Sequence, residues 1–506
     1  MTQKQYLKKK HELTDEQKKI LEASRNMEKG EILQVTACAG SGKTSTLAET
    51  AKANPSRTFL YLAFNKAAAE DAAKKFPKNV EVRTVHSAAY REMVTKGPYK
   101  GMQIMNIRAY DVMTALGTND YFFARDALEK YTAFLHSDEE KARGIAEILY
   151  ELVEDKKLPL THDHYLKAFQ IRNLARKNFG KNHDYLMLDE AQDSNDVTMS
   201  LFLNNGTRRI IVGDPNQQIY AFRGAVNIMD KIHAGKKLTL STSFRCPENV
   251  IARCNALIRE YKPDSYIKMS ATHPGEIKLD QEKKTAFLSR CNARLISCFS
   301  SLIDDGKIDS VRFERDPDRI FTPALCVLDL MNGDLARSKE MSFINNFEDL
   351  EDLTEYAEDT NDMELLGAIT LAKNLGDRLE PLYGMAKMCY RKQNKEERDI
   401  SLSTAHSSKG LEWENVVILD DFVPLEESAA DVNDGKMTQE ELNEEVNLFY
   451  VTCTRSIQNI IDASGNMRSL LRMKAITQDD YDKNENLSER VIKDKNFSRQ
   501  QKNHVA

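Results

Sequence analysis

Residues 32–47, with the sequence ILQVTACAGSGKTSTL, constrain the fold of this chain more than any other segment. The apolar run at its start predicts a short buried strand, and the small residues that follow predict a tight turn. Lys43 and Thr44 then open a predicted helix. In this order, backbone N–H groups and the helix N-terminus surround a phosphate, the lysine reaches its oxygens, and the threonine hydroxyl meets Mg²⁺. The segment therefore predicts a phosphate-binding loop.

The loop departs from the usual pattern at its first position, where Ala37 replaces glycine. Its remaining residues are small enough for the backbone to wrap closely around a phosphate. The residues expected to line the nucleotide here are Ala39, Gly40, Ser41, Gly42, Lys43, Thr44 and Ser45.

Composition is that of an ordinary globular protein. The chain has 506 residues, enough for two to four domains, with 41% hydrophobic residues, 30% charged residues and a net charge of −6. No apolar run approaches a membrane span, and the N-terminus lacks the apolar stretch of a signal peptide. The eight scattered cysteines argue against disulfides, zinc and iron–sulfur clusters. We expect the protein in the cytoplasm of a bacterial or phage-infected cell, or in a eukaryotic nucleus, without a membrane partner.

Further apolar runs at residues 58–64, 80–84, 184–188 and 208–213 alternate with helical patterns, which predicts a parallel sheet covered by helices. Ligands bind such sheets at the carboxyl ends of the strands. Four residues are expected at these ends: Phe64, Asn65, Thr84 and His86.

Two adjacent carboxylates, Asp189 and Glu190, end the strand at residues 184–188. Adjacent carboxylates at a strand end are costly unless a cation neutralises them. Mg²⁺ bound to ATP would do so for Asp189, and Glu190 would orient and deprotonate the attacking water.

The strand at residues 208–213 leads into Gln217, which we expect near the γ-phosphate. Tyr220, Phe222 and Arg223 follow and form an aromatic–cation cluster suited to stacking on unpaired bases. Aromatic residues in such a position are also common in protein cores.

Gln17 has two interpretations. With Thr14 three residues earlier, it completes a capping box at a helix start. Because an amide donates and accepts at once, Gln17 also suits the edge of adenine. Both interpretations stay open at this point.

A second alternating region predicts another parallel sheet, with strands at residues 238–240, 286–288, 400–403, 416–419 and 459–462. The expected organisation is a first sheet domain from residues 1–87 and 184–235 with a helical insertion at 88–183, and a second from residues 236–292 and 399–475 with a reduced helical insertion at 293–398. Residues 476–506 form a polar tail.

Ten segments resemble, in order, the motifs of superfamily 1 helicases of the UvrD/Rep/PcrA type: LTDEQ, ACAGSGKT, YLAFNKAAAE, RTVHS, LDEAQD, VGDPNQQIYAFRGA, TSFRCPENV, SRCNA, TAHSSKGLEW and EEVNLFYVTCTR. Three phrases, FNKAAAEDAAKKFP, THDHYLKAFQ and EEVNLFYVTCTR, are most similar to the F-box DNA helicase branch, although no F-box segment is apparent ahead of Leu13. The resemblance implies an α/β fold of two RecA-like P-loop NTPase domains with parallel sheets, each carrying a mainly helical insertion.

The resemblance also implies roles for individual residues, with ATP and Mg²⁺ as cofactors. Thr44 and Asp189 would hold Mg²⁺, with Glu190 as the catalytic base. The other residues implied at the nucleotide are Gln17 and Phe244 at adenine, Lys43 and Gln217 at the phosphates, Glu412 at the ribose or phosphates, and Arg245 and Arg455 as arginine fingers. The residues implied at single-stranded DNA are Phe64, Asn65, Thr84, His86, Tyr220, Phe222, Arg223 and His406.

The implied activity is ATP-dependent, 3′-to-5′ movement on single-stranded DNA or at its junctions with duplex, in repair, recombination or replication. The insertion at residues 293–398 is short for the larger helicases. An alternative is therefore a translocase that strips recombinase filaments or replication proteins from DNA with little unwinding. A scaffold without activity is disfavoured by the intact motif residues, and a preference for RNA over DNA stays open.

Overall fold

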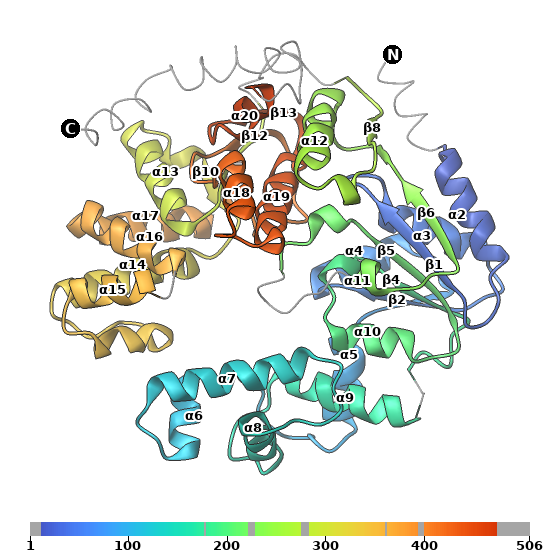
Figure 1. Cartoon of the computed structure of the whole chain (residues 1–506), viewed down its shortest axis with the longest axis horizontal. Coiled ribbons are helices and arrows are strands. Elements are labelled where there is room, and N and C mark those ends of the chain that lie inside the picture. The colour runs from blue at the N-terminus through green and yellow to red at the C-terminus, as the bar shows by residue number, and fades with distance from the viewer. Residues whose placement is uncertain are drawn as a thin grey trace. The chain divides into compact units, whose positions relative to one another are not determined.

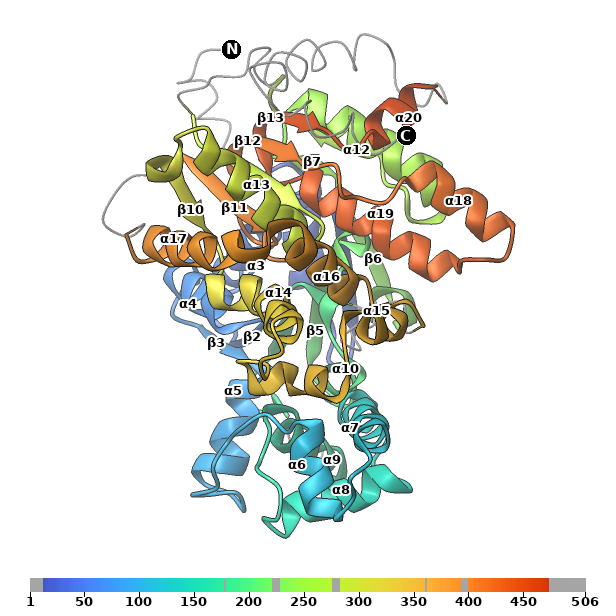
Figure 2. The same cartoon turned by 90° about the vertical axis from the view of Figure 1, so that its left-hand side faces the viewer.

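The computed structural model describes residues 12–176, 179–220, 228–274, 283–359, 362–392 and 399–472. It divides the chain into two compact units, Met1–Thr242 and Ser243–Ala506. Each unit contains one large parallel sheet with helices on both faces (Figures 1 and 2). Phe222, Arg223 and the predicted tail lie outside the described residues.

The first unit has a sheet of six parallel strands in the order β3-β2-β4-β5-β1-β6. The strands are β1 (Ile32–Ala37), β2 (Phe59–Ala63), β3 (Val80–Thr84), β4 (Tyr185–Leu188), β5 (Arg208–Gly213) and β6 (Lys236–Leu240). The phosphate-binding loop follows β1, which lies between β5 and β6 inside the sheet. The predicted strand–loop–helix order is therefore present.

Helices α2 (Asp15–Arg25), α3 (Lys43–Lys52) and α4 (Lys66–Lys75) cover one face of this sheet. Side chains alternate between the two faces of a strand. On β2, Phe59 and Tyr61 pack in the core beneath these helices, whereas Leu60 and Leu62 belong to the core of the opposite face. The sheet is thus buried on both sides, as parallel sheets are.

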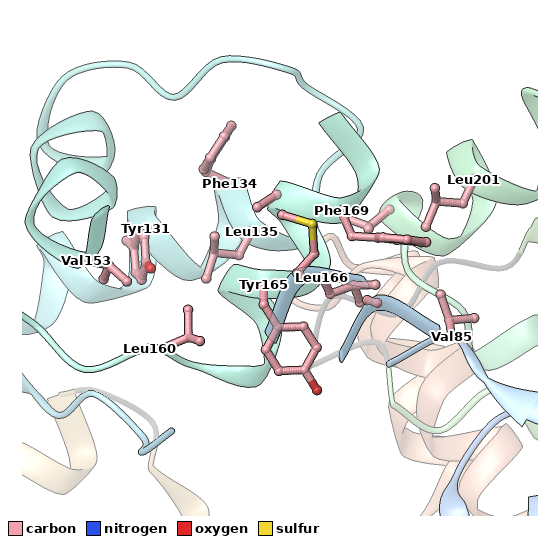
Figure 3. Packing of buried hydrophobic residues seen from close by; sticks show 14 of the residues in the cluster. Val85, Tyr131, Phe134, Leu135, Val153, Leu160, Tyr165, Leu166, Phe169 and Leu201 are labelled. Carbon is pink, nitrogen blue, oxygen red and sulfur yellow. The ribbon is translucent and has the colours of Figure 1, made fainter. Parts of the chain in front are cut away.

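The opposite face carries the helical insertion together with α10 (Asp196–Leu203) and α11 (Ile228–Lys231). The helices of the insertion are α5 (Val85–Tyr90), a π-helical turn (Arg91–Thr95), α6 (Ala109–Leu116), α7 (Tyr121–His136), α8 (Ile145–Glu154) and α9 (His162–Arg176). Helix α9 contacts α5, α7 and α10. Figure 3 shows its Leu166 and Phe169 among the buried side chains that join the insertion to the sheet.

The strand at residues 238–240 forms, but the prediction that it belongs to the second sheet is wrong. It is the end of β6, which pairs in parallel with β1 at the edge of the first sheet. The first unit accordingly runs to Thr242 rather than ending at residue 235. An alternating strand pattern predicts which side chains face a core, but it does not predict the sheet in which the strand pairs.

The second unit has five parallel strands in the order β10-β11-β9-β12-β13. They are β9 (Thr285–Ser289), β10 (Val311–Phe313), β11 (Ile400–Thr404), β12 (Trp413–Ile418) and β13 (Ser456–Asp462), and the short strands β7 (Thr242–Ser243) and β8 (Ser270–Ala271) pair separately. Helices α12 (Glu248–Tyr261) and α19 (Gln439–Cys453) pack against each other and against β13. Helices α18 (Leu425–Asn433) and α20 (Asn466–Arg472) lie beside them.

One large core in this unit joins α13 (Asn292–Asp304) and the insertion to the sheet. The insertion contains α14 (Pro317–Met331), α15 (Leu350–Asp359), α16 (Met363–Leu375) and α17 (Leu379–Lys392). The segment is mainly helical, as expected, and it also contains β10, a strand that was not predicted and that pairs with β11 at the sheet edge. Three residues are too few for a period-2 pattern to stand out from the neighbouring helices. Within the described ranges, no helix is long and apolar enough to cross a membrane.

Candidate nucleotide site and nucleic-acid interface

The phosphate-binding loop closes between β1 and α3 through two glycines with left-handed backbone, Gly40 with φ 70° and Gly42 with φ 77°. Gly42 is the N-cap of α3, a position where a β-carbon would be strained. The Ser41 hydroxyl donates to the carbonyl of Cys38 over 2.8 Å and fixes the turn from within. The loop therefore presents the N-terminus of α3, the kind of terminus that binds phosphate.

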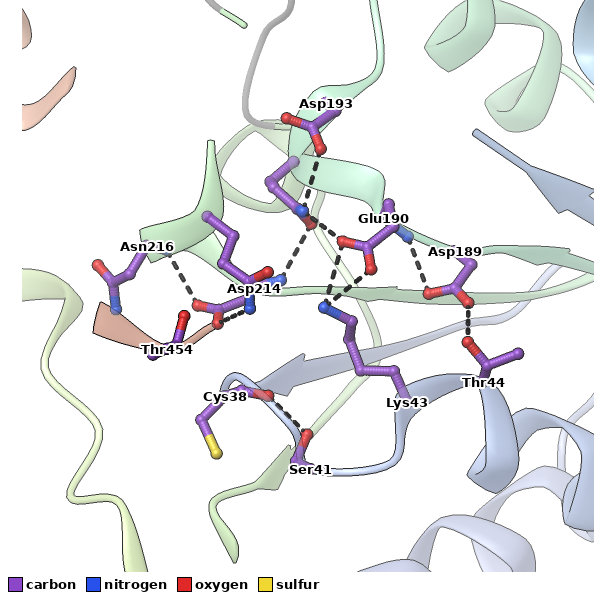
Figure 4. A network of polar contacts seen from close by, with 12 residues as sticks. Cys38, Ser41, Lys43, Thr44, Asp189, Glu190, Asp193, Asp214, Asn216 and Thr454 are labelled. Carbon is purple, nitrogen blue, oxygen red and sulfur yellow. Dashed lines mark hydrogen bonds and ion pairs between the residues drawn. The ribbon is translucent and has the colours of Figure 1, made fainter. Parts of the chain in front are cut away.

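Asp189 lies directly beside this helix terminus. The Thr44 hydroxyl donates to Oδ2 of Asp189 over 2.7 Å (Figure 4). Tyr185 and Met187 of β4 face the α3 side of the sheet, and Asp189 continues that alternation. Because its carboxylate is buried and next to Glu190, the pKa of Asp189 is raised.

Glu190 turns toward the same place through an unusual backbone conformation, with φ 51°. Its carboxylate pairs with the ammonium of Lys43, with Nζ 3.1 Å from Oε1. Burial lowers the pKa of Lys43, but the charges of Glu190, Asp214 and Asp189 outweigh burial and raise it. A single lysine therefore faces three carboxylates at the loop, an excess of negative charge that a bound cation would reduce.

The residues present fit a magnesium ion. Thr44 and Asp189 bring two oxygen ligands together, and Mg²⁺ is commonly held by one or two protein oxygens plus substrate phosphates and water. No gathering of three or more His, Cys, Asp and Glu side chains suited to a metal occurs in the part of the chain that the structure describes. Thr44 and Asp189 would therefore hold the ion together with the nucleotide.

Gln217, which the sequence predicts near the γ-phosphate, is buried at the end of β5. Its amide donates to Oδ2 of Asp214 over 2.6 Å. Asp214 has a raised pKa, principally because it is buried. The structure thus brings Gln217 into the same polar network as Lys43, through Asp214.

Gln17 has the capping role that the sequence predicts. It forms the capping box of α2 with Thr14, with hydrogen bonds of 3.0 and 3.2 Å. Its amide nitrogen also donates to the hydroxyl of Thr46 on α3, over 3.0 Å. The side chain is therefore held against the helix that follows the loop. A role at adenine stays a prediction.

Five of the residues predicted at DNA, Phe64, Asn65, Thr84, His86 and Tyr220, end or follow strands of the first sheet at its carboxyl edge. Phe64 is 43% exposed and stacks on Tyr220, with ring centroids 5.7 Å apart and an angle of 12° between the planes. Asn65 and Thr84 cap helices: each side chain accepts a backbone N–H, in α4 and α5 respectively. His86 lies on α5 with its ring partly exposed.

In the second unit, Arg245 and Glu412 lie together, with Nε of Arg245 donating to Oε2 of Glu412 over 2.7 Å. Arg455 is only 1% exposed, and its guanidinium donates to the carbonyl oxygens of Val451 and Leu411 over 2.8 and 3.3 Å. Phe244 and His406 are partly buried. The structure brings the Arg245–Glu412 pair together, and it buries Arg455 among backbone carbonyls of the second unit.

Comparisons with known proteins agree with the motifs and the fold. Residues 20–223 match a family model described as an AAA domain, and residues 332–461 match one described as the UvrD-like helicase C-terminal domain. F-box DNA helicase 1 of Gallus gallus is 29% identical over 500 residues, which is 88% of this chain and 48% of the chicken protein. F-box DNA helicase protein 1 of Schizosaccharomyces pombe is 28% identical over 511 residues, 89% of this chain and 57% of the yeast protein.

The chain belongs to the UvrD-like helicases of superfamily 1. It spans about half the length of the F-box relatives. A shorter match of 128 residues, 31% identical, covers 23% of this chain and 11% of the RecB subunit of the RecBCD enzyme of Buchnera aphidicola. Both sheets are of the RecA-like P-loop kind that the resemblance implies.

Two further residues of this chain belong to the polar network, and the sequence-based prediction missed both. The buried hydroxyl of Tyr61 on β2 donates to Oδ2 of Asp189 over 2.7 Å. Gln192 donates to Oε2 of Glu190 over 2.6 Å and accepts the backbone N–H of Asp214 over 3.0 Å. Tyr61 looked like an ordinary strand residue, whereas Gln192 was visible within the DEAQD segment but was given no role.

Proposed function

We propose that this protein is an ATP-dependent DNA helicase or translocase that moves 3′-to-5′ on single-stranded DNA, with roles in repair, recombination or replication. The observation that carries the proposal is the convergence of Lys43, Asp189 and Glu190 on one phosphate-binding loop in a UvrD-like chain. The relatives named as DNA helicases support DNA as the track. The polarity rests on the family resemblance.

In the proposed reaction, the loop and Lys43 hold the phosphates of ATP. Glu190 accepts a proton from the attacking water, whose oxygen bonds to the γ-phosphorus as the bond to the ADP oxygen breaks. Gln192 holds the Glu190 carboxylate in place during this transfer. Bound Mg²⁺, held by Thr44 and Asp189, would neutralise charge on the phosphate oxygens.

Two arginines of the second unit have further proposed roles. Arg245 and Arg455 would stabilise the charge that develops on the γ-phosphoryl oxygens, as arginine fingers do. In the structure Arg455 donates to backbone carbonyls of its own unit.

The proposed DNA interface is the carboxyl edge of the first sheet, with Phe64 and Tyr220 as the stacking pair. Contacts to phosphates and base faces carry little sequence information, so binding should depend on salt and tolerate any sequence. His406, Asn65, Thr84 and His86 are the further proposed contacts.

To test the proposal, the rate of ATP hydrolysis is measured for the wild type, Lys43→Ala and Glu190→Gln, each with single-stranded DNA, duplex DNA or RNA. Single-stranded DNA should stimulate the wild type most, and either substitution should lower the rate by about 10²-fold or more. Partial duplexes with a 3′ or a 5′ tail then test the polarity, because only on a 3′ tail should movement lead into the duplex and displace the paired strand. A wild type that DNA does not stimulate would contradict the proposal, and normal hydrolysis by Glu190→Gln would contradict its role as the base.

A second candidate is a translocase that strips recombinase filaments or other proteins from single-stranded DNA while unwinding little duplex. It is favoured by the insertion of the second unit, because α14, α16 and α17 share one continuous core with the sheet. Such an insertion offers limited independent surface for engaging a duplex. A strand-displacement assay run beside a filament-clearance assay separates the two candidates, and efficient unwinding of long duplexes by a monomer would favour the first.

A further inference from the structure

Asp163 lies between two histidines that come from different helices of the insertion. It is in the first turn of α9, and its Oδ1 lies 3.3 Å from Nε2 of His86 on α5. Its Oδ2 lies 3.3 Å from Nε2 of His136, in the last turn of α7. One carboxylate therefore joins three helices, and one of them starts at the carboxyl end of β3.

The carboxylate is held in its ionised form. Burial raises the pKa of Asp163, but hydrogen bonds and charges from His136 and His86 outweigh burial and leave the pKa well below its usual range. The start of a helix also favours a negative charge. An ionised carboxylate only accepts hydrogen bonds, so His86 must present Nε2–H to Asp163. Nδ1 is then the ring nitrogen on the other side, away from this carboxylate.

A second contact from α9 fixes the plane of the same ring. Tyr165 meets His86 edge-to-face, with centroids 6.3 Å apart and an angle of 85° between the rings. The hydroxyl of Tyr165 is in turn 2.9 Å from Nδ1 of His162. Figure 3 shows Tyr165 and Leu166 on α9 within the buried cluster. The ring of His86 is thus oriented by a helix that is itself anchored in the core.

We propose that Asp163 is a positioning residue that holds the imidazole of His86 in one orientation toward the DNA backbone, with His136 bracing the carboxylate from α7. The proposal rests on the proposed function, in which His86 contacts DNA. His86 lies at the edge where parallel sheets bind ligands, and its side chain is 42% exposed. With Nε2–H donated to Asp163, the imidazolium form of the ring offers its second N–H, at Nδ1, to a phosphate oxygen, so the proposed ligand is the sugar–phosphate backbone and not the bases.

The test is a double-mutant cycle of Asp163→Asn and His86→Ala, read out as the affinity for a fluorescent oligothymidylate without nucleotide. Asp163→Asn should weaken binding by roughly 3- to 10-fold, the effect of one lost hydrogen bond. The rate of ATP hydrolysis at saturating DNA should change by less than about two-fold, because the nucleotide site is untouched. In the His86→Ala background, Asp163→Asn should have no further effect on DNA affinity.

The matched control is Glu154→Gln, which alters another carboxylate–histidine pair of the insertion. Glu154 lies 2.8 Å from Nε2 of His164, a histidine with no exposed surface. This control should leave DNA affinity unchanged. If it weakens binding as much as Asp163→Asn does, the effect is one of general packing and the proposal is wrong.

Thermal unfolding of every variant checks that the insertion is folded, and Asp163→Ser replaces Asp163→Asn if the latter is unstable. The positioning role would be overturned if the Asp163→Asn variant bound DNA normally. It would also be overturned if the double variant lost DNA affinity by the product of the two single losses. Either result would leave the proposed function intact. A wild type that fails to bind single-stranded DNA would overturn the proposed function, and the positioning role with it.

Discussion

The hydroxyl of Tyr61 donates to Oδ2 of Asp189 over 2.7 Å, from a neighbouring strand of the same sheet. The same oxygen accepts the hydroxyl of Thr44. The carboxylate that we assign to Mg²⁺ is therefore oriented from two sides before any nucleotide arrives.

Tyr61→Phe should raise the Mg²⁺ concentration needed for half-maximal binding of a fluorescent ATP analogue by roughly 3- to 10-fold, because Asp189 loses one orienting hydrogen bond. Nucleotide binding at saturating Mg²⁺ should be nearly normal. Tyr185→Phe is the matched control, since Tyr185 faces the same core but donates to the carbonyl of Ser24 over 2.7 Å. An equal shift in both variants would contradict the role of Tyr61.

Gly213→Ala should lower the maximal rate of ATP hydrolysis by about 10-fold with little loss of ATP binding. An added β-carbon at Gly213 would lie 2.7 Å from Oε1 of Gln192, which must then move away from Glu190. A misoriented base transfers the proton poorly. Gly206→Ala, where the β-carbon meets nothing within 4 Å, is the control and should hydrolyse ATP normally. An unaffected Gly213→Ala enzyme would show that Gln192 does not orient the base.

Phe64→Ala and Tyr220→Ala should each weaken binding of single-stranded DNA by about 5-fold or more, the value of stacking on one base. Because the two rings stack on each other, the double variant should lose less than the product of the two effects. Phe122→Ala removes an aromatic ring that is 58% exposed on α7, and we expect it to bind DNA normally. Fluorescence anisotropy at two salt concentrations measures the DNA affinity of these four variants and of the wild type. Unchanged affinity in both single variants would exclude this pair from the interface.

Lys167→Met should stabilise the first unit at pH 7 by at most about 3 kcal/mol. Lys167 has no exposed surface, and burial lowers its pKa to about 8 despite the charges of Asp138, Glu139 and Glu140. In the unfolded chain its pKa returns to near 10.5, so the unfolded state binds more protons between these values. The free energy of unfolding of the wild type should therefore rise as the pH increases from 8 to 10.5. The difference in stability between Lys167→Met and the wild type should shrink over the same range.

Urea unfolding at pH 7 and pH 10, followed by circular dichroism, measures the difference in stability between Lys167→Met and the wild type. Lys130→Met on the exposed side of α7 is the control, because Lys130 pairs with Asp126 at the surface. Its effect should stay within about 0.5 kcal/mol at both pH values. A Lys167→Met advantage that does not change with pH would contradict the burial of a charged lysine.

The parts of the site that are short, local sequence motifs could be predicted from the sequence. The loop at Gly42–Lys43–Thr44 and the carboxylates at Asp189 and Glu190 each follow an apolar strand, so their places at the sheet edge follow from local pattern. Parallel pairing then brings them together, because the carboxyl ends of parallel strands share one edge.

Other features depend on which elements become neighbours in space, and sequence pattern alone does not specify that. The assignment of residues 238–240 to the second sheet failed because a strand pattern carries no information on its partner. Tyr61 was missed because its role arises from the pairing of β2 with β4. Asp163 was missed in the same way, since its partners His86 and His136 are 77 and 27 positions away in the chain.

The left-handed backbone at Glu190 affects how a trapped, ATP-bound form of the protein should be prepared. Glu190→Gln removes the negative charge while retaining a side chain of the same length on the same strained backbone. Glycine or asparagine at this position would also relieve the backbone strain, and the connection from β4 to Gln192 would become free to relax. Only the glutamine variant therefore isolates the chemistry of the carboxylate, and it is the form to choose for capturing the protein on DNA before hydrolysis.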